Sequence, residues 1–121
     1  MPGGTRRAQK PNEYVVGGKW PHAMMRVHRG ALVAQAIARR LAETMADQKL
    51  SANALARRSG VNRQVIANVL NGTVWPDMLT VVDLEGALGV KLWPDHLEWK
   101  IPAPGESPEG GVTGPQETAS E

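Results

Sequence analysis

Side chains that could carry out covalent or metal chemistry are few in this chain and lack the arrangements that such chemistry needs. The 121 residues contain no cysteine, which excludes a thiol nucleophile, a disulfide scaffold, a cysteine-ligated zinc finger and an iron–sulfur cluster. No serine has a histidine or lysine placed to activate it, and the histidines are not spaced like metal ligands. We therefore expect no enzyme activity, no metal and no cofactor. The residues concerned are Ser51, Ser59, Ser107, Ser120, His22, His28 and His96.

Hydrogen-bonding side chains over residues 63–70 are the strongest chemical signal. At 100° per residue of a helix, one side carries a guanidinium, two amides and a methyl, and the opposite side is apolar. Arginine can form paired hydrogen bonds with guanine, glutamine and asparagine can do so with adenine, and alanine can contact the thymine methyl. The pattern alone also suits an ordinary solvated helix face. The polar side consists of Arg63, Gln64, Ala67 and Asn68.

Capping residues predict two short helices around this stretch. Ser51 is a good N-cap for a helix over residues 52–59, and Gly60 suits the left-handed position that ends it. Asn62 is a second N-cap, for a helix from residue 63 to about residue 70 that stops at Asn71-Gly72. A short turn containing glycine, with the small Ala56 before it, lets two helices cross steeply. This is the layout of a helix-turn-helix.

Apolar periodicity supplies the remaining elements. It predicts a first helix over residues 31–48 and another over residues 79–88, which carries Val82, Leu84 and Leu88 and ends at Gly89. A last short turn or helix is expected near Pro94-Asp95, with Leu97 and Trp99. We expect Trp93 in the core and Trp75-Pro76 over the end of the helix at residues 63–70. The predicted fold is a compact, all-α, five-helix domain over residues 30–101.

Charge divides the chain into three parts. Residues 1–29 carry a net charge of +5, residues 30–101 carry +1, and residues 102–121 carry −4. The first part is expected to be a basic, partly disordered arm, with a small hairpin or an irregular segment packed by Trp20 within it. Residues 102–121 are rich in Pro, Gly and Glu and are expected to be a disordered tail. The arm suggests a polyanionic partner, such as DNA with Arg6 and Arg7 in its minor groove, although both tails could simply be solvated.

A set of spaced positions carries a family resemblance: Leu55-Ala56, Gly60-Val61, Ile66, Asn71-Gly72, Pro76, Leu79 and Leu88-Gly89-Val90. Through these positions, residues 31–97 resemble the lambda-repressor-like, Cro/C1-type (XRE family) helix-turn-helix domain. The resemblance implies that Arg63, Gln64 and Asn68 contact bases, and Ala67 on the same side of the helix is expected to join them through its methyl group. The sequence departs from the family pattern at Ala52, where many members have glutamine. It also departs at Met45 and Leu70, where many members have a buried ion pair; here we expect an apolar contact in its place. The positions matching phosphate contacts, or lying near them, are Ser51, Asn62, Asn71, Thr73, Arg57 and Arg58.

The expected function is sequence-specific binding of double-stranded DNA by a bacterial or phage transcription regulator, with repression as the commoner outcome. A homodimer on a palindromic site is expected by analogy. Residues 14–16 could instead pair with a second copy, and Trp99 could lie in either core or interface. Two alternatives stay open: an antitoxin that binds a protein partner through its arm or tail, and an interaction domain that has lost DNA binding. No apolar run is long enough to cross a membrane, so the expected location is the cytoplasm, at the nucleoid.

Overall fold

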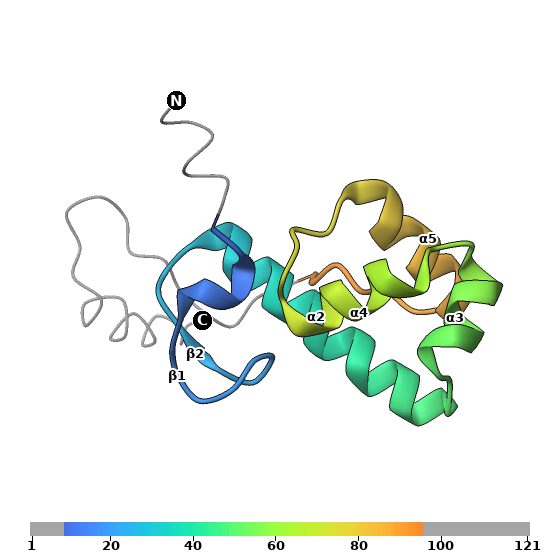
Figure 1. Ribbon diagram of the computed structural model, residues 1–121, viewed down its shortest axis with the longest axis horizontal. Coiled ribbons are helices and arrows are strands. Elements are labelled where there is room, and N and C mark those ends of the chain that lie inside the picture. Colours follow the sequence, from blue (N-terminus) through green and yellow to red (C-terminus); the bar gives the residue numbers. More distant parts are fainter. Residues whose placement is uncertain (1–8, 96–121) are drawn as a thin grey trace, which may run out of the picture.

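The computed structural model describes residues 9–95 of the chain. Over this part the fold consists of a short 3₁₀ helix, a two-stranded hairpin and four α-helices (Figure 1). The α-helices α2 to α5 form the helical body, and the hairpin lies beside the beginning of α2. The elements are η1 (Pro11–Tyr14), β1 (Val15–Gly17), β2 (Met24–Met25), α2 (Arg29–Gln48), α3 (Ala52–Ser59), α4 (Arg63–Asn71) and α5 (Met78–Leu88).

The predicted caps fix most helix ends. Helix α3 has the predicted bounds, and α4 extends one residue beyond the predicted end, to Asn71. Helix α2 begins two residues earlier than predicted because Nδ1 of His28 accepts the Ala31 N–H at 3.0 Å. Helix α5 begins at Met78, one residue before the predicted start, because the carboxylate of Asp77 accepts the Thr80 N–H at 2.7 Å.

An aliphatic core lies between α2, α3, α4 and α5. Of the three apolar residues singled out in the pattern of α5, Leu84 and Leu88 are buried, but Val82 is 54% exposed and its neighbour Val81, 4% exposed, faces the core instead. Seven of the eleven residues of α5 are apolar, including the adjacent Val81 and Val82, so periodicity could not distinguish its inner side from its outer side. Met45 belongs to the buried cluster and Leu70 packs against it, so both positions make apolar contacts with the core, whereas the expected contact between these two side chains stays a prediction. The buried cluster consists of Ile37, Leu41, Met45, Leu55, Val61, Ile66, Val69, Val81, Leu84, Leu88 and Leu92.

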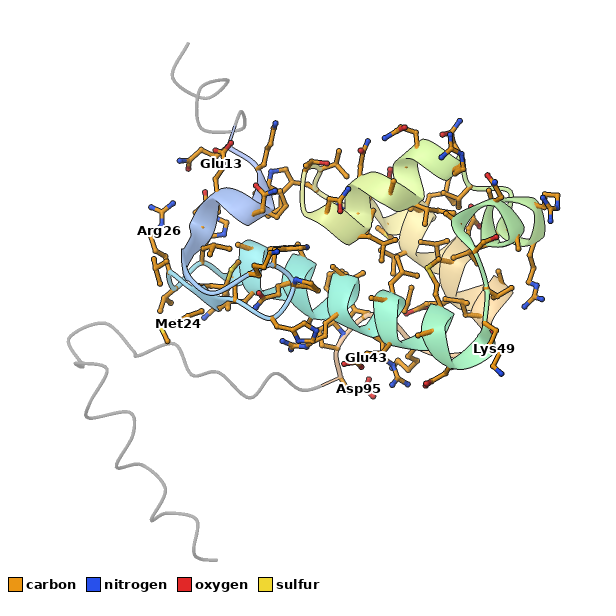
Figure 2. The ribbon with its side chains drawn as sticks, turned by 60° about the horizontal axis from the view of Figure 1, so that its bottom comes forward. Glu13, Met24, Arg26, Glu43, Lys49 and Asp95 are labelled. Atoms are coloured by element: carbon orange, nitrogen blue, oxygen red, sulfur yellow. The ribbon has the colours of Figure 1, made fainter. Side chains whose placement is uncertain are left out.

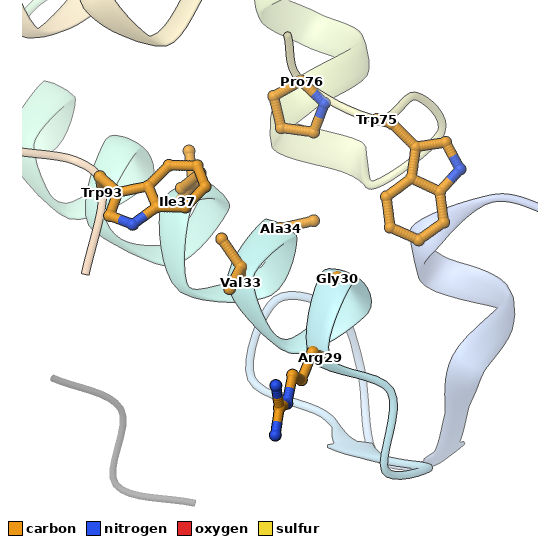
Figure 3. Close-up of a pocket in the computed structure, with 8 residues that line it drawn as sticks. All are labelled: Arg29, Gly30, Val33, Ala34, Ile37, Trp75, Pro76 and Trp93. Carbon is orange, nitrogen blue, oxygen red and sulfur yellow. The ribbon is translucent and has the colours of Figure 1, made fainter. Parts of the chain in front are cut away.

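The segment after α5 differs from the prediction. Residues 90–95 are not helical, and the carboxylate of Glu85 accepts the N–H groups of Leu92 and Trp93 at 2.7 and 3.0 Å. These bonds turn the chain so that Leu92 enters the core. The turn or helix expected near Pro94-Asp95, with Leu97 and Trp99, extends beyond the described residues. Trp93 is not in the core, because it is 53% exposed. It borders an apolar pocket of about 280 Å³, across from Trp75 and Pro76 and above the first turns of α2 (Figure 3).

Residues 9–28 fold against the helices. Strand β1 pairs antiparallel with β2, with Val15 opposite Met25, so the hairpin alternative for this segment is confirmed. Helix η1 packs against α2, and the Ala23 N–H donates to the buried side chain of Gln35 at 3.0 Å. The Tyr14 ring stacks on His28 at 4.2 Å between centroids. Our expectations for Arg6, Arg7, His96, Leu97, Trp99 and residues 102–121 concern residues outside the described range.

Within that range, no helix combines the length and the apolar character that crossing a membrane requires.

Candidate nucleic-acid interface

The turn between α3 and α4 is held by short-range hydrogen bonds. The Ser51 hydroxyl accepts the Ala54 N–H at 3.0 Å and so caps α3. Gly60 ends α3 with a φ of 81°, a left-handed conformation that favours glycine. The Asn62 side chain then accepts the Gln64 N–H at 2.7 Å and begins α4. Because both helix ends are capped, the angle between α3 and α4 is set locally.

Buried side chains of α4 leave its polar side facing outward. Ile66 and Val69 are buried in the core, whereas Arg63 and Gln64 are exposed and Ala67 and Asn68 are half-buried. The structure therefore places the four predicted base-contacting residues on the outer side of α4. Nε2 of Gln64 donates to Oδ1 of Asn68 at 3.1 Å, so the two amides form one hydrogen-bonded unit.

The predicted phosphate contacts differ in what their side chains already bind. The side-chain oxygens of Ser51 and Asn62 accept backbone N–H groups as caps, which leaves the Ser51 O–H and the Asn62 Nδ2 as donors. The hydroxyl of Thr73 donates to the Asn68 carbonyl at 3.3 Å, so its hydrogen is already used within the chain. The other three predicted residues are exposed: Arg57, Arg58 and Asn71.

Electrostatics favour an anion on this side of the molecule. Residues 51–76 contain three arginines and no Asp or Glu. The acidic side chains Glu43 and Asp95 lie on the opposite side of α2 from α4 (Figure 2). The three arginines attract a polyanion toward the outer side of α3 and α4. Among residues 9–95, no three His, Asp or Glu side chains come together as a metal site.

In a comparison with family models, residues 41–92 match the model described as Helix-turn-helix. These residues form a Cro/C1-type helix-turn-helix domain. The matched range covers α3, α4 and α5 and begins within α2, which is narrower than the resemblance over residues 31–97. Comparisons with curated proteins and with solved structures found no match.

The helix-turn-helix domain belongs to a class that binds DNA and is typically non-enzymatic. Ala52 occupies the position at which many family members have glutamine. Its side chain is half-buried and packs against the core instead of reaching outward.

Three sets of contacts that support the domain were not predicted from the sequence. Asn12 and Trp20 hydrogen-bond to the end of α4, and Glu85 holds the turn after α5. Asn12 and Trp20 act on a helix at least 50 residues away, so no local pattern could reveal them.

Proposed function

We propose that this protein is a sequence-specific DNA-binding transcription regulator that inserts α4 into the major groove, and that it acts by occluding its site as a repressor. The observation that carries the proposal is the polar outer side of α4 on a capped turn, within a helix-turn-helix domain whose residues 51–76 carry positive charge alone. In helix-turn-helix proteins the second helix enters the major groove, and residues near its N-terminus contact base edges. Arg63 and Gln64 occupy those positions in α4.

The chemistry of the α4 side chains supports base recognition. The bond between Gln64 and Asn68 uses one polar atom of each amide. The remaining atoms, Oε1 of Gln64 and Nδ2 of Asn68, make no hydrogen bond within residues 9–95. They provide one acceptor and one donor, which complement the N6 amino group and N7 of adenine. Arg63 at the beginning of α4 complements the O6 and N7 acceptors of guanine. We therefore propose contacts with both adenine and guanine.

Phosphate contacts would set the register of the protein on the duplex. Arg57 and Arg58 lie in the last turn of α3, and the Ser51 O–H, Asn62 Nδ2 and Asn71 side chain offer further donors. Contacts of this kind contribute affinity for any DNA sequence, and that affinity falls as the salt concentration rises.

The test is selection of bound duplexes from a random pool by the full chain, followed by affinity measurements on the selected duplex. Arg63→Ala and Gln64→Ala should each cost about 1–3 kcal/mol of binding free energy and relax the preference at one or two base pairs. Lys49→Asn is the matched control, because it removes a cation outside α3 and α4, and asparagine tolerates the left-handed φ of 55° at that position. If both α4 variants retain the preferred site of the wild type, the assignment of Arg63 and Gln64 as base-contacting residues is wrong.

We also propose a symmetric dimer formed through α5. Met78, Leu79 and Val82 are exposed by 78, 69 and 54%. A helix that is apolar around most of its circumference is normally buried on both sides, and α5 is covered on one side only by the described residues. Two copies joined by this surface would present two α4 helices to half-sites about 34 Å apart, one turn of DNA.

Sedimentation equilibrium tests the dimer separately from DNA binding. Val82→Asp should shift the chain toward the monomer while leaving its helical circular dichroism unchanged. Asp83→Ala, at the neighbouring exposed position, is the control for altered charge on α5. A wild-type chain that sediments as a monomer at every concentration would exclude the dimer.

A further inference from the structure

Three consecutive carbonyl groups at the C-terminal end of α4 are each bound by a donor from the N-terminal part of the chain. Nε1 of Trp20 donates to the Leu70 carbonyl at 3.0 Å, and Nδ2 of Asn12 donates to the Asn71 carbonyl at 3.0 Å. The backbone N–H of Asn12 donates to the Gly72 carbonyl at 2.9 Å. Carbonyls at a helix end lack partners within the helix and are usually satisfied by water or by local capping. Here a segment distant in sequence supplies their partners.

The Trp20 ring also lies directly against the residue that ends α4. A Cβ atom added to Gly72 would lie 2.5 Å from Cε2 of Trp20, which is closer than real Cβ contacts. The indole thus packs on the backbone of Gly72 while its N–H binds the Leu70 carbonyl. Because both contacts involve backbone atoms of α4, they restrain the helix itself and leave its outward side chains unobstructed.

The segment that makes these contacts is anchored to other parts of the fold. Pro11 in η1 is buried, and η1 packs against α2. The indole N–H of Trp75 donates to the Gln9 carbonyl at 2.9 Å. Residues 9–20 therefore connect the beginning of the long helix α2 to the end of α4, as Figure 1 shows at the blue end of the chain. This segment lies outside the matched range of residues 41–92.

We propose that residues 9–20 form an N-terminal clamp that sets the orientation of α4 for DNA recognition, with Asn12 and Trp20 as its positioning residues. The inference rests on the proposed function, since it concerns the same helix and the same ligand. Base contacts require side chains held to within about 0.5 Å of the productive geometry. The capped turn at Gly60 fixes the N-terminal end of α4, and the N-terminal clamp fixes the other end. With both ends fixed, Gln64 and Asn68 keep one orientation.

The N-terminal clamp also changes the electrostatics at this end of the helix. The C-terminal end of a helix carries a partial negative charge, which repels phosphate. The three donors offset that charge, and Lys10, two residues before Asn12, adds a positive charge to the segment, against one nearby acid, Glu13. The segment thus removes a source of repulsion next to Asn71, one of the predicted phosphate contacts.

Trp20→Phe and Asn12→Ala test the proposal without altering the charge of the protein. Tyr14→Phe is the matched control. It removes the Tyr14 hydroxyl from the same segment, and the 3.0 Å hydrogen bond from this hydroxyl to Gln9 does not involve α4. Affinity is measured for the selected duplex and for a random duplex, well below the melting temperature of each variant. We expect each clamp variant to lose about 5- to 30-fold affinity for the selected duplex, the effect of one or two hydrogen bonds, with little change on the random duplex.

A second measurement does not depend on DNA. Amide hydrogen exchange of Gly72 and Thr73, whose N–H groups bond within the last turn of α4, should accelerate in the clamp variants and not in Tyr14→Phe. The proposal is overturned if the clamp variants match the wild type on the selected duplex. It is also overturned if they lose affinity equally on both duplexes, which is the result of a general loss of stability.

Failure of the proposed function would look different from failure of this inference. If the wild-type chain binds no duplex at low salt, the proposed function is refuted, and the positioning role falls with it. If the wild type binds selectively and the clamp variants do so equally well, only the N-terminal clamp is refuted.

Discussion

Replacing Gly72 with alanine tests the contact between α4 and Trp20 most directly. Gly72 has a φ of 75°, and an added Cβ would lie 2.5 to 2.8 Å from three ring atoms of Trp20. The chain contains two controls, Gly60 and Gly89, which have φ values of 81° and 72° and nothing within 4 Å of an added Cβ. All three substitutions impose the same backbone strain, and only Gly72→Ala displaces a neighbour.

The expected magnitudes follow from these two contributions. A left-handed alanine costs about 1–2 kcal/mol, partly offset by about 0.4–1 kcal/mol from the reduced entropy of the unfolded chain. Gly60→Ala and Gly89→Ala should therefore each cost about 1 kcal/mol. Gly72→Ala should cost about 2 kcal/mol more, because moving the indole gives up a hydrogen bond worth about 1 kcal/mol and a similar amount of ring packing. At about 4–8 °C per kcal/mol, the melting temperature should lie roughly 10 °C below that of the controls.

Urea unfolding followed by far-ultraviolet circular dichroism measures these differences without relying on tryptophan fluorescence. A double-mutant cycle with Trp20→Ala isolates the contact, since Gly72→Ala should cost only about 1 kcal/mol once the indole is gone. If Gly72→Ala is no less stable than Gly60→Ala and Gly89→Ala, Trp20 does not lie against the end of α4.

Three further changes test other parts of the structure. Ser51→Ala removes the cap of α3 and should lower the free energy of unfolding by about 1 kcal/mol, measured by urea titration; an unchanged midpoint would contradict the cap. Leu70→Glu places a charge against the apolar cluster and should melt several degrees below Leu70→Met, and equal melting temperatures would exclude the packing of Leu70 against that cluster. Hydrogen bonds from the backbone and side chain of Thr80 hold the pKa of the Asp77 carboxyl below its ordinary value. The ionised cap therefore stabilises the fold above about pH 4 and loses this effect as the pH falls further. Asp77→Asn should reduce the loss of unfolding free energy between about pH 4 and lower pH, measured by urea titration at several pH values. If this pH dependence matches that of the wild type, the Asp77 carboxylate does not stabilise α5.

Local signals in the sequence determined much of the candidate interface. Ser51, Gly60 and Asn62 act through hydrogen bonds or backbone conformation within three residues of themselves, so the bounds of α3 and the beginning of α4 follow from the residue types. The outward direction of Gln64 follows in the same way, because helix geometry places it about 160° around the helix from the buried Ile66.

The tertiary structure decided what depends on distant partners. Val81 faces the core and Val82 does not because of how α5 packs, and Trp93 is held outside the core by the turn at Glu85. Asn12 and Trp20 reach α4 across 59 and 50 residues of sequence. The free energy of such contacts depends on which surfaces the folded chain brings together, whereas the free energy of a cap depends on the next few residues alone.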